Sequence, residues 1–565
     1  MTASPLASIV LAALAWLAIG AAGLAAPRNL RTVRGLFLAG AAVAAVLAIV
    51  AGLALADPPR TAVLPLGLPD LPFHLRLDAL SAFFLLLLGA ATAAVSVFSA
   101  GYFREGAGTA PGLICFEYHA FAAAMAFVLV ADDAYLFMVA WETMAVASYF
   151  LVITDHRIPE VRQAGFLYLL IAHLGAIAIL LCFGVLQGGH GDYTFAAMRA
   201  VTLSPAWASV AFLLALVGFG AKAGLLPLHV WLPEAHPAAP SPVSALMSGV
   251  MLKLAVYGLL RVTFDLLAGT LWWWGAIALA LGLLTALFGV IFAAAQTDMK
   301  RLLAYSSIEN LGIIVAAMAL AILFRTNGKP LLAAIALAAL LYHALNHALF
   351  KSLLFLATGS VLHATSERSL GKLGGLIHRM PWVAWLALVG TLASAGLPPL
   401  NGFVSEWLLL QAFLFTPSLP QSFINMLVPL AAAALVLAVA LAGYVMVKFY
   451  GVIFLGQPRE PSLERAHDAG RFERIGLVWL AAGCVALGVF PTYVINVLEL
   501  VPMQLGLIDT RTLGGSWWRV VPVMGRQASY APLVFLIVVT TVIVLTIFAV
   551  RFFYHGRARR SAPWD

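Results

Sequence analysis

Residues 134–153 read AYLFMVAWETMAVASYFLVI, an apolar run in which Glu142 is the one charged residue. At a rise of about 1.5 Å per residue, such a helix crosses the roughly 30 Å hydrocarbon core of a bilayer, with Glu142 near its middle. An ionisable group at that depth costs at least about 2.5–3.5 kcal/mol on insertion scales, so it normally marks a path for protons, ions or a substrate. The run predicts a membrane helix with a functional carboxylate.

The composition of the whole chain points the same way. Its 565 residues are 63% hydrophobic and only 10% charged, with a mean hydropathy of +1.00, whereas soluble domains carry about 25% charged residues. We therefore predict an all-α polytopic membrane protein. Cys115, Cys182 and Cys484 lie in apolar segments without metal-ligand spacing, and are interpreted as buried small hydrophobes. This spacing predicts no iron–sulfur or zinc site, and no nucleotide-binding motif occurs. Neither a metal nor a cofactor is therefore expected.

Apolar runs predict about fifteen transmembrane helices, within a range of 14–16, the first being a retained helix rather than a cleaved signal. The expected spans are residues 6–26, 35–56, 79–102, 113–131, 133–154, 164–187, 207–227, 243–263, 272–295, 302–323, 331–360, 382–410, 424–455, 475–498 and 531–553.

The connecting segments set the orientation. Most of their lysines and arginines fall on the side of the first loop, among them Arg28, Arg157 and Lys300. Cytoplasmic loops are rich in Lys and Arg, which predicts an external N-terminus and a cytoplasmic C-terminus in a prokaryotic plasma membrane. The net charge of +8 reflects this bias and attraction to the lipid bilayer, and no nucleic acid partner is expected.

Two apolar segments contain an unusual combination of Gly, Pro and charge. Residues 218–229 read GFGAKAGLLPLH, and residues 394–406 read SAGLPPLNGFVSE. Proline removes a backbone donor and clashes with the preceding turn, so both helices should break there. Paired interruptions five helices apart indicate two inverted five-helix repeats. Two unrelated proline kinks are the alternative.

Eight residues are candidates for a proton pathway. Glu142 and Lys222 are expected to pair across neighbouring helices and tune each other's proton affinity, or else to form a static ion pair. Lys253 is central in the next span and is interpreted as a lysine that exchanges protons, or one that pairs with an acid elsewhere. His229, shortly after Pro227, is a possible link between the two lysines.

The other candidates lie in the second half. His343, His347 and Lys351 are spaced i, i+4, i+8, which places them on one helix face and suits a proton relay better than a metal site. Glu406 follows the second break and is expected to exchange protons with water, or to cap the helix. Weaker candidates near span ends are attributed to capping or snorkelling: Glu117, Glu309, His173, His363 and Lys448. Arg261 lies at a helix end, where it is expected to snorkel. Asp132 and Asp133 are expected to be solvated.

The chain resembles the antiporter-like proton-translocating subunits of complex I, Mrp antiporters and membrane-bound hydrogenases. The resemblance lies in residues 220–247 and 342–355, in the short segments around Glu142 and Glu309, and in residues 398–407. The chain is most similar to the hydrogenase-4 and formate hydrogenlyase branch, over roughly residues 70–455. The resemblance implies two inverted five-helix repeats, each with a broken helix. It places the family's glutamate at Glu142, its lysines at Lys222 and Lys253, and its exit residue at Glu406.

The resemblance also implies an organisation and a function. Residues 1–112 would be N-terminal helices, 113–263 the first repeat with its break near 222–242, 264–455 the second with its break near 394–406, and 456–565 C-terminal helices. The chain would couple redox chemistry in other membrane and peripheral subunits to proton transfer, without a catalytic redox site of its own. The alternatives are an Mrp-type sodium/proton antiporter module and a membrane partner of an inorganic-carbon uptake enzyme.

Overall fold

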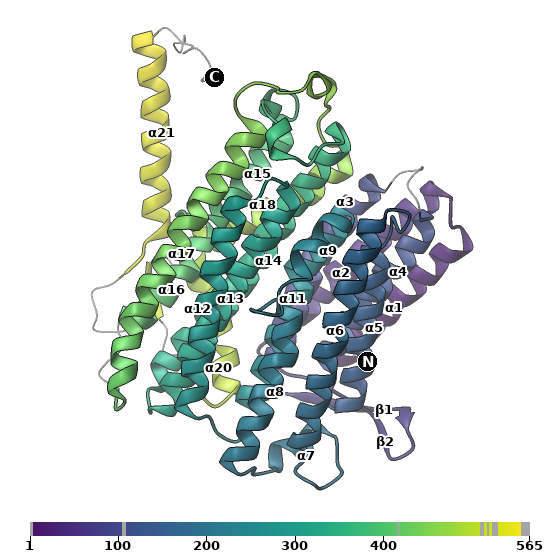
Figure 1. The fold of residues 1–565 in the computed structure, drawn as a ribbon, viewed down its shortest axis with the longest axis vertical. Helices are drawn as coiled ribbons and strands as arrows, with labels where there is room; N and C mark the ends of the chain where they lie inside the picture. Colours follow the sequence, from purple (N-terminus) through teal and green to yellow (C-terminus); the bar gives the residue numbers. More distant parts are fainter. Residues whose placement is uncertain are drawn as a thin grey trace.

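The computed structural model describes residues 4–103, 109–414, 416, 419–508, 514–516, 519–521 and 529–554. Long helices run side by side and are tilted together through the molecule (Figure 1). Within the described ranges, 14 helices are long and apolar enough to cross a membrane. The prediction of an all-α multi-pass membrane protein is therefore confirmed. The expected cytoplasmic C-terminus falls in residues 555–565, outside the described residues.

The first half of the chain begins with two helices and a β-hairpin, followed by the helices that carry Glu142, Lys222 and Lys253. The elements are α1 (Pro5–Ala25), α2 (Leu30–Ala54), β1 (Arg60–Leu68), β2 (Leu71–Leu77), α3 (Ala79–Tyr102), α4 (Pro111–Val130), α5 (Ala134–Val152), α6 (Pro159–Leu186), α7 (Phe195–Ala200), α8 (Pro205–Ala223), α9 (Leu232–Ala238), α10 (Ser241–Leu246), η1 (Met247–Met251), α11 (Leu252–Leu260) and η2 (Arg261–Leu266).

The second half also consists mainly of long helices. Its elements are α12 (Trp272–Ala295), α13 (Met299–Thr326), α14 (Pro330–Thr365), the short turns η3 (Leu370–Lys372) and η4 (Leu376–His378), α15 (Pro381–Ser394), α16 (Asn401–Leu414), α17 (Ser422–Phe454), η5 (Pro461–Arg465), α18 (Arg471–Val489), α19 (Pro491–Leu498), α20 (Leu500–Gln504), β3 (Gly514–Ser516), β4 (Arg519–Val521) and α21 (Pro532–Tyr554).

Both predicted interruptions are present. Helix α8 ends at Gly224, whose positive φ of 78° closes the helix, and the chain turns before α9 and α10 continue. The expected span 382–410 is likewise divided into α15 and α16, with Gly396 at φ 62° between them. Glycine adopts this left-handed conformation without the penalty that a Cβ would bring. The two breaks place Lys222 and Glu406 beside irregular backbone.

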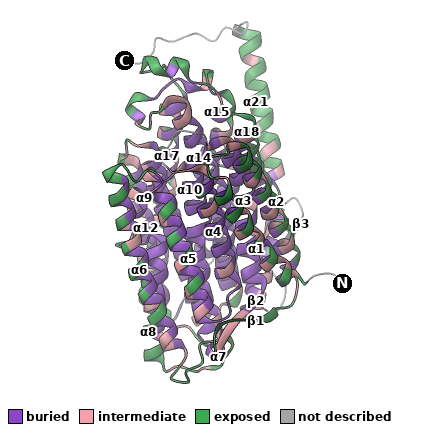
Figure 2. Cartoon of the chain, turned by 90° about the vertical axis from the view of Figure 1, so that its right-hand side faces the viewer, coloured by how far each residue is buried: buried purple, intermediate pink, exposed green. Residues whose placement is uncertain are grey.

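The core of the bundle consists of the segment Ser241–Leu266 together with α13 and α14. In the most apolar windows of the first two, all residues are buried, and in that of α14 89% are, while none is buried in that of α21. Figure 2 shows this gradient from the buried interior to the exposed rim. A charged side chain on these core helices is shielded from lipid by protein on all sides, which is where membrane proteins tolerate ionisable groups.

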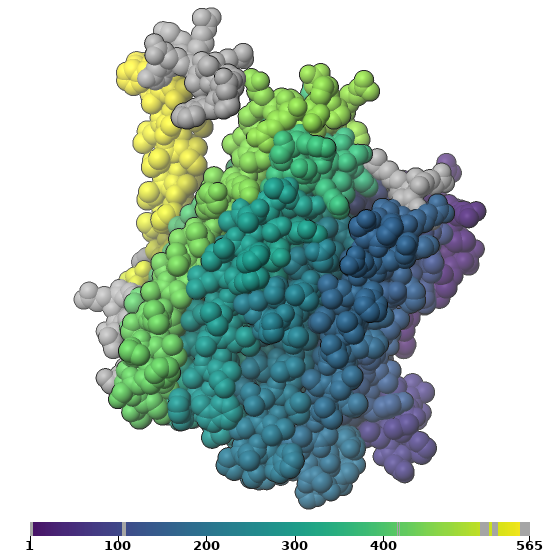
Figure 3. All heavy atoms as spheres, in the orientation of Figure 1, coloured from purple at the N-terminus to yellow at the C-terminus, as the bar shows by residue number. Residues whose placement is uncertain are grey.

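The β-hairpin was not anticipated from the sequence. Strands β1 and β2 pair antiparallel from Arg60 opposite Leu77 to Leu68 opposite Leu71, at the end of the bundle that also carries α7 (Figure 1). At the other extreme of the chain, α21 stands clear of the bundle in the space-filling view (Figure 3). Its sequence is apolar on every face, in keeping with a helix surrounded by lipid.

Candidate functional site

Glu142 lies on a partly exposed side of α5, and its nearest basic group is a histidine. Its carboxylate Oε2 is 3.7 Å from Nδ1 of His173 on α6, and the two side chains are 33% and 51% exposed. Lys222 is not within ion-pair distance of Glu142 among the described residues, so the predicted direct pair is corrected to a longer-range electrostatic interaction. His173, predicted as a snorkelling residue, is therefore part of the site.

Lys222 instead contacts a tyrosine that sequence reasoning missed. Its Nζ donates to the hydroxyl of Tyr168 at 2.7 Å, and that hydroxyl lies 2.6 Å from Ser148 Oγ on α5. Tyr168 also contacts the sulfur of Met251, at 3.7 Å. A hydroxyl both donates and accepts, so Tyr168 can hand a proton between Lys222 and the interior of the bundle.

Lys253 lies at the start of α11, directly after the π-helical segment η1. A π-helical turn shifts the backbone hydrogen bonds by one residue and is frequent at functional sites. The Lys253 ammonium donates to the Ser248 carbonyl at 2.6 Å and to Nδ1 of His347 on α14. The sequence predicted both side chains as members of one pathway, and the fold brings them into contact across 94 residues of chain.

Lys351 begins a hydrogen-bonded string that crosses to α13. Its Nζ donates to Ser306 Oγ at 2.6 Å, and this hydroxyl donates to Glu309 Oε2 at 3.1 Å. Asn310 Nδ2 donates to the same carboxylate oxygen at 3.2 Å. Glu309 is only 2% exposed and lies in the first half of a 28-residue helix. The interpretation of Glu309 as a capping or snorkelling residue is therefore wrong.

His343 continues the string to the second helix break. Its Nε2 lies 3.1 Å from Asn310 Oδ1, and its Nδ1 lies 3.0 Å from Ser405 Oγ on α16. Asn346 joins the same serine and donates to the Asn401 carbonyl at 2.6 Å. The buried polar groups thus run continuously from α14 through α13 to α16 (residues Lys351, Ser306, Glu309, Asn310, His343 and Ser405).

Glu406 follows Ser405, the last member of this string, in the first turns of α16 after the break. It is 7% exposed and lies against the backbone of Gly396, where an added Cβ would come 2.1 Å from its Oε2. Glu406 also interacts electrostatically with Glu309. Gly396 has the positive φ that ends α15, so one residue serves both the turn and the space that the carboxylate occupies.

We expect the Gly396→Ala variant to be impaired in function and modestly destabilised. A left-handed alanine costs about 1–2 kcal/mol, and the new methyl group displaces the Glu406 carboxylate. Thermal unfolding in detergent and ion transport in vesicles measure the two effects. Gly443→Ala is the matched control, since a Cβ there meets no atom within 4 Å. Equal behaviour of the two variants would contradict the role of Gly396.

His229 does not join this row directly. Its ring packs edge-on against Phe288, with 4.7 Å between centroids, and its Nδ1 has no hydrogen-bond partner among the described residues. A second histidine, His236, is fully buried, stacks on Phe355 and interacts electrostatically with Lys300, Lys351 and Lys253. A link from Lys222 to Lys253 through His229 stays a prediction.

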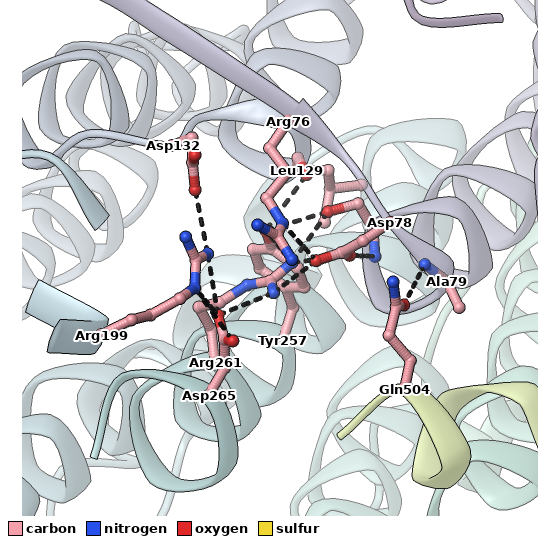
Figure 4. A network of polar contacts seen from close by, with 11 residues as sticks. Arg76, Asp78, Ala79, Leu129, Asp132, Arg199, Tyr257, Arg261, Asp265 and Gln504 are labelled. Atoms are coloured by element: carbon pink, nitrogen blue, oxygen red, sulfur yellow. Dashed lines mark hydrogen bonds and ion pairs between the residues drawn. The ribbon is translucent and has the colours of Figure 1, made fainter. Parts of the chain in front are cut away.

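A separate ionic cluster joins the ends of several helices on the hairpin side (Figure 4). Arg261 donates to both oxygens of Asp78, at 2.7 and 2.9 Å, and to Asp265 at 3.0 Å. Arg199 extends the cluster by contacting Asp265 and Asp132. Arg261 is 3% exposed, so its expected snorkelling is corrected to burial in a cluster of three arginines and three aspartates, the remaining arginine being Arg76.

Asp78 occupies the N-cap of α3 within this cluster. Burial alone would raise the pKa of Asp78, but the facing Arg261 guanidinium and several hydrogen bonds hold it well below its ordinary value of 3.8. The carboxylate is therefore charged at neutral pH. Asp132 and Asp133, predicted as solvated, are buried at 6% and 0% exposure. Asp133 instead caps α5 through the Leu136 N–H, at 2.6 Å.

The remaining weaker candidates divide into three cases. Lys448 donates to the Ala294 and Gln296 carbonyls at 2.6 and 2.8 Å, so its expected capping role is confirmed. Glu117 is buried rather than snorkelling. His363 stacks on Tyr102 with 3.9 Å between ring centroids.

The three cysteines are buried, as predicted. No group of three metal-ligating side chains occurs in the described part of the chain.

The sequence matches a known protein family and several of its members. Residues 131–452 match the family described as NADH:quinone oxidoreductase/Mrp antiporter, TM. The chain is 42% identical to hydrogenase-4 component B of Escherichia coli K12 over 73% of its own length and 62% of that relative. It is 36% identical to formate hydrogenlyase subunit 3 of the same organism, over 78% of this chain and 70% of that one.

A solved structure has the same fold over nearly the whole chain. It is the membrane-bound sulfane sulfur reductase, described as an archaeal respiratory membrane complex, with a TM-score of 0.81 and 28% identity over 98% of this chain and 86% of that one. The chain spans only about 62% of the length of hydrogenase-4 component B. The matched residues 131–452 include every predicted pathway residue from Glu142 to Glu406.

Proposed function

Because the chain belongs to the family of NADH:quinone oxidoreductase and Mrp antiporter membrane subunits, we propose that it moves protons for a multisubunit redox complex. Redox chemistry in other subunits, of the complex I or membrane-bound hydrogenase type, would drive the transfer. The relatives in Escherichia coli are components of a hydrogenase and of formate hydrogenlyase. The predicted division into two inverted repeats, with the N-terminus outside, is part of this proposal.

The observation that carries the proposal is the buried string from Lys351 to Ser405. Its hydrogen bonds measure 2.6, 3.1, 3.2, 3.1 and 3.0 Å in order. Every member has an exchangeable proton or a lone pair, and Glu309 and His343 can take up or release a proton. Ionisable residues buried in a membrane protein are costly, so a purely structural row of this length would be difficult to maintain.

Lys253 and His347 join this string to the first half of the chain. Two ammonium groups close together repel in a low-dielectric interior, so a proton on Lys253 disfavours one on Lys351. A proton that moves from Lys253 to His347 would lie one helical turn from Lys351 and would favour the release of the Lys351 proton toward Ser306. Among the described residues no hydrogen bond joins Tyr168 to Lys253, and the Tyr168 hydroxyl instead contacts the sulfur of Met251, two residues before Lys253. Hydration or movement of Met251 would then control transfer between the two halves.

Glu142 is the point at which a partner could act. Its carboxylate and His173 are partly exposed on the outer face of α5 and α6, and it interacts electrostatically with both Lys222 and Tyr168. A neighbouring subunit that covers this face would change the solvation of Glu142. The changed electrostatic potential would alter the proton affinity of Lys222. A distant redox event would in this way be linked to Lys222 and the buried residues beyond it.

A sodium/proton antiporter is the second candidate, because antiporter subunits are among the relatives. The chain is 33% identical over 302 residues to a sodium/proton antiporter subunit of Alkalihalophilus pseudofirmus. Sodium, a hard cation, requires several oxygen ligands, whereas Lys253, His347 and Lys351 supply nitrogens, and the Ser306 oxygen beside Glu309 already accepts from the Lys351 ammonium. The side chains therefore favour protons.

The Lys222→Met variant tests the proposal. We expect it to abolish proton translocation by the assembled complex while leaving assembly intact, because methionine fills the space of lysine but carries no proton. Lys222→Arg should be inactive as well, since arginine keeps the charge and does not release it. Proton uptake by inverted vesicles, normalised to redox turnover, measures both. Normal uptake in Lys222→Met would overturn the proposal, and normal uptake in Lys222→Arg would reduce Lys222 to a static charge.

A further inference from the structure

A cleft of about 640 Å³ separates the first turn of α15 from the first turns of α18. Its lining includes two arginines of α18, Arg471 and Arg474, and Trp382 of α15. Farther along α18 the wall becomes apolar, with Ile475, Val478 and Trp479. The helices α15 and α18 both begin here, so the cleft lies where two apolar helices enter the membrane.

The charged rim has an excess of positive charge. Arg471 makes no ion pair among the described residues. Arg474 stacks over the Trp382 ring at 5.4 Å and reaches Asp468 only at 3.9 Å. The Asp468 carboxylate already accepts hydrogen bonds from the backbone N–H groups of Trp382 and Ala469, at 2.9 and 2.8 Å. Within the described part of the chain, the one carboxylate that Arg474 approaches is therefore already engaged in capping α15, and Arg471 is left without an ion pair.

The apolar part of the cleft faces the lipid. Trp382 and Trp479 are 50% and 52% exposed, and Ile475 and Val478 are 45% and 41% exposed. Tryptophan is enriched at the boundary between headgroups and hydrocarbon. A second groove of about 340 Å³, lined by α2, α3 and α18, shares Ile475 and Trp479 as a common wall. Below the arginines, two apolar grooves thus run side by side.

We propose that this cleft binds one anionic phospholipid. Its phosphate would lie against Arg471 and Arg474, and its two acyl chains would occupy the grooves on either side of Ile475 and Trp479. Arginine suits phosphate because its planar fork donates two parallel hydrogen bonds. A soluble anion would leave the two apolar grooves empty, and an acidic protein segment would have to bury charge in the hydrocarbon layer. An anionic phospholipid matches both the arginines and the two apolar grooves.

The position of the cleft connects the lipid to the proton row. Helix α15 runs from Trp382 at the cleft to Ser394 at the second break, beside which Glu406 packs against Gly396. A bound headgroup would fix the first turn of α15. The lipid would thereby stabilise the element that ends at the break.

Photocrosslinking tests the site in the assembled complex. The complex is reconstituted into phosphatidylcholine vesicles containing a trace of photoactivatable phosphatidylglycerol, and labelled peptides are identified by mass spectrometry. We expect label in residues 471–482 from the phosphatidylglycerol probe and much less from a phosphatidylcholine probe. Each basic residue near the headgroups contributes about fivefold in affinity, so Arg471→Gln/Arg474→Gln should reduce labelling by roughly tenfold to thirtyfold.

Arg28→Gln/Arg31→Gln is the matched control. It removes two exposed arginines at the same end of the bundle, where Arg34 of α2 lies over the Phe472 ring at 5.8 Å, and should leave the labelling unchanged. In the unmodified complex the labelling should fall with ionic strength, which tests the charge contact without any variant. Equal labelling by both probes would overturn the proposal. Protection of the peptide by a partner subunit, or a loss of label with inorganic phosphate much greater than with chloride at the same ionic strength, would do the same.

Discussion

Lys351→Met is expected to abolish proton translocation, the largest functional effect among the side chains of the row. Lys351 donates to Ser306, which connects it to Glu309 and, through Asn310, to His343. Methionine has a similar length but neither donates nor carries a proton, so the string loses its first member. Proton uptake by inverted vesicles at constant redox turnover should fall by at least about tenfold, as when a required proton carrier is removed.

Lys448→Met is the matched control for this variant. Lys448 also lies in a long apolar helix, α17, but its ammonium bonds only the Ala294 and Gln296 carbonyls among the described residues. Its replacement should leave proton uptake near that of the unmodified complex. If both lysine variants lost uptake equally, the effect would reflect the general loss of a membrane lysine and the string would not carry protons.

Arg261→Met is expected to cause the largest loss of stability. The guanidinium is 3% exposed and neutralises both Asp78 and Asp265. Removing one partner of a buried ion pair typically costs about 3–5 kcal/mol, because the remaining charge is buried without compensation. The Arg261 guanidinium is the main group that holds the pKa of Asp78 below 3.8 against its burial, so the variant should lose most stability at high pH, where Asp78 cannot take up a proton. Thermal unfolding in detergent measures the loss.

Two further variants distinguish the loss of a charge from the loss of this cluster. Asp78→Asn/Arg261→Met removes both partners and should regain part of the stability, because fewer buried charges are left unpaired. Arg60→Met removes an arginine whose pair with Asp57 is 45% and 37% exposed, and should change stability by less than about 1 kcal/mol. If Arg261→Met lost no more stability than Arg60→Met, the structural role of the cluster would be contradicted.

The breaks and the lysine row could be predicted because their signals are local. Gly224 and Gly396 lie close to prolines in apolar runs, which predicts the breaks. A lysine within such a run, such as Lys253 or Lys351, indicates a functional site wherever it lies in the membrane. The expected spans accordingly fall close to the observed helices. The spacing of His343, His347 and Lys351 likewise needs only the geometry of one helix.

Contacts between distant segments could not be predicted in this way. Asp78 and Arg261 are 183 residues apart, and Tyr168 and Lys222 are 54 apart, so neither pair leaves a local pattern. Glu309 was misjudged because the expected span began at residue 302, whereas α13 begins at Met299 and is covered by other helices on all sides. The hairpin was missed because its prolines and glycine read as a connecting segment.

The double variant Lys351→Met/Glu309→Gln tests the central claim most directly. Both charges are removed together, so a row that served only as a buried ion pair would function again once neither charge is left unpaired. The measurement is the number of protons translocated per electron pair by the assembled complex in sealed vesicles. If Lys351 and Glu309 carry the protons, this ratio stays as low in the double variant as in Lys351→Met. Recovery of the native ratio would contradict the account.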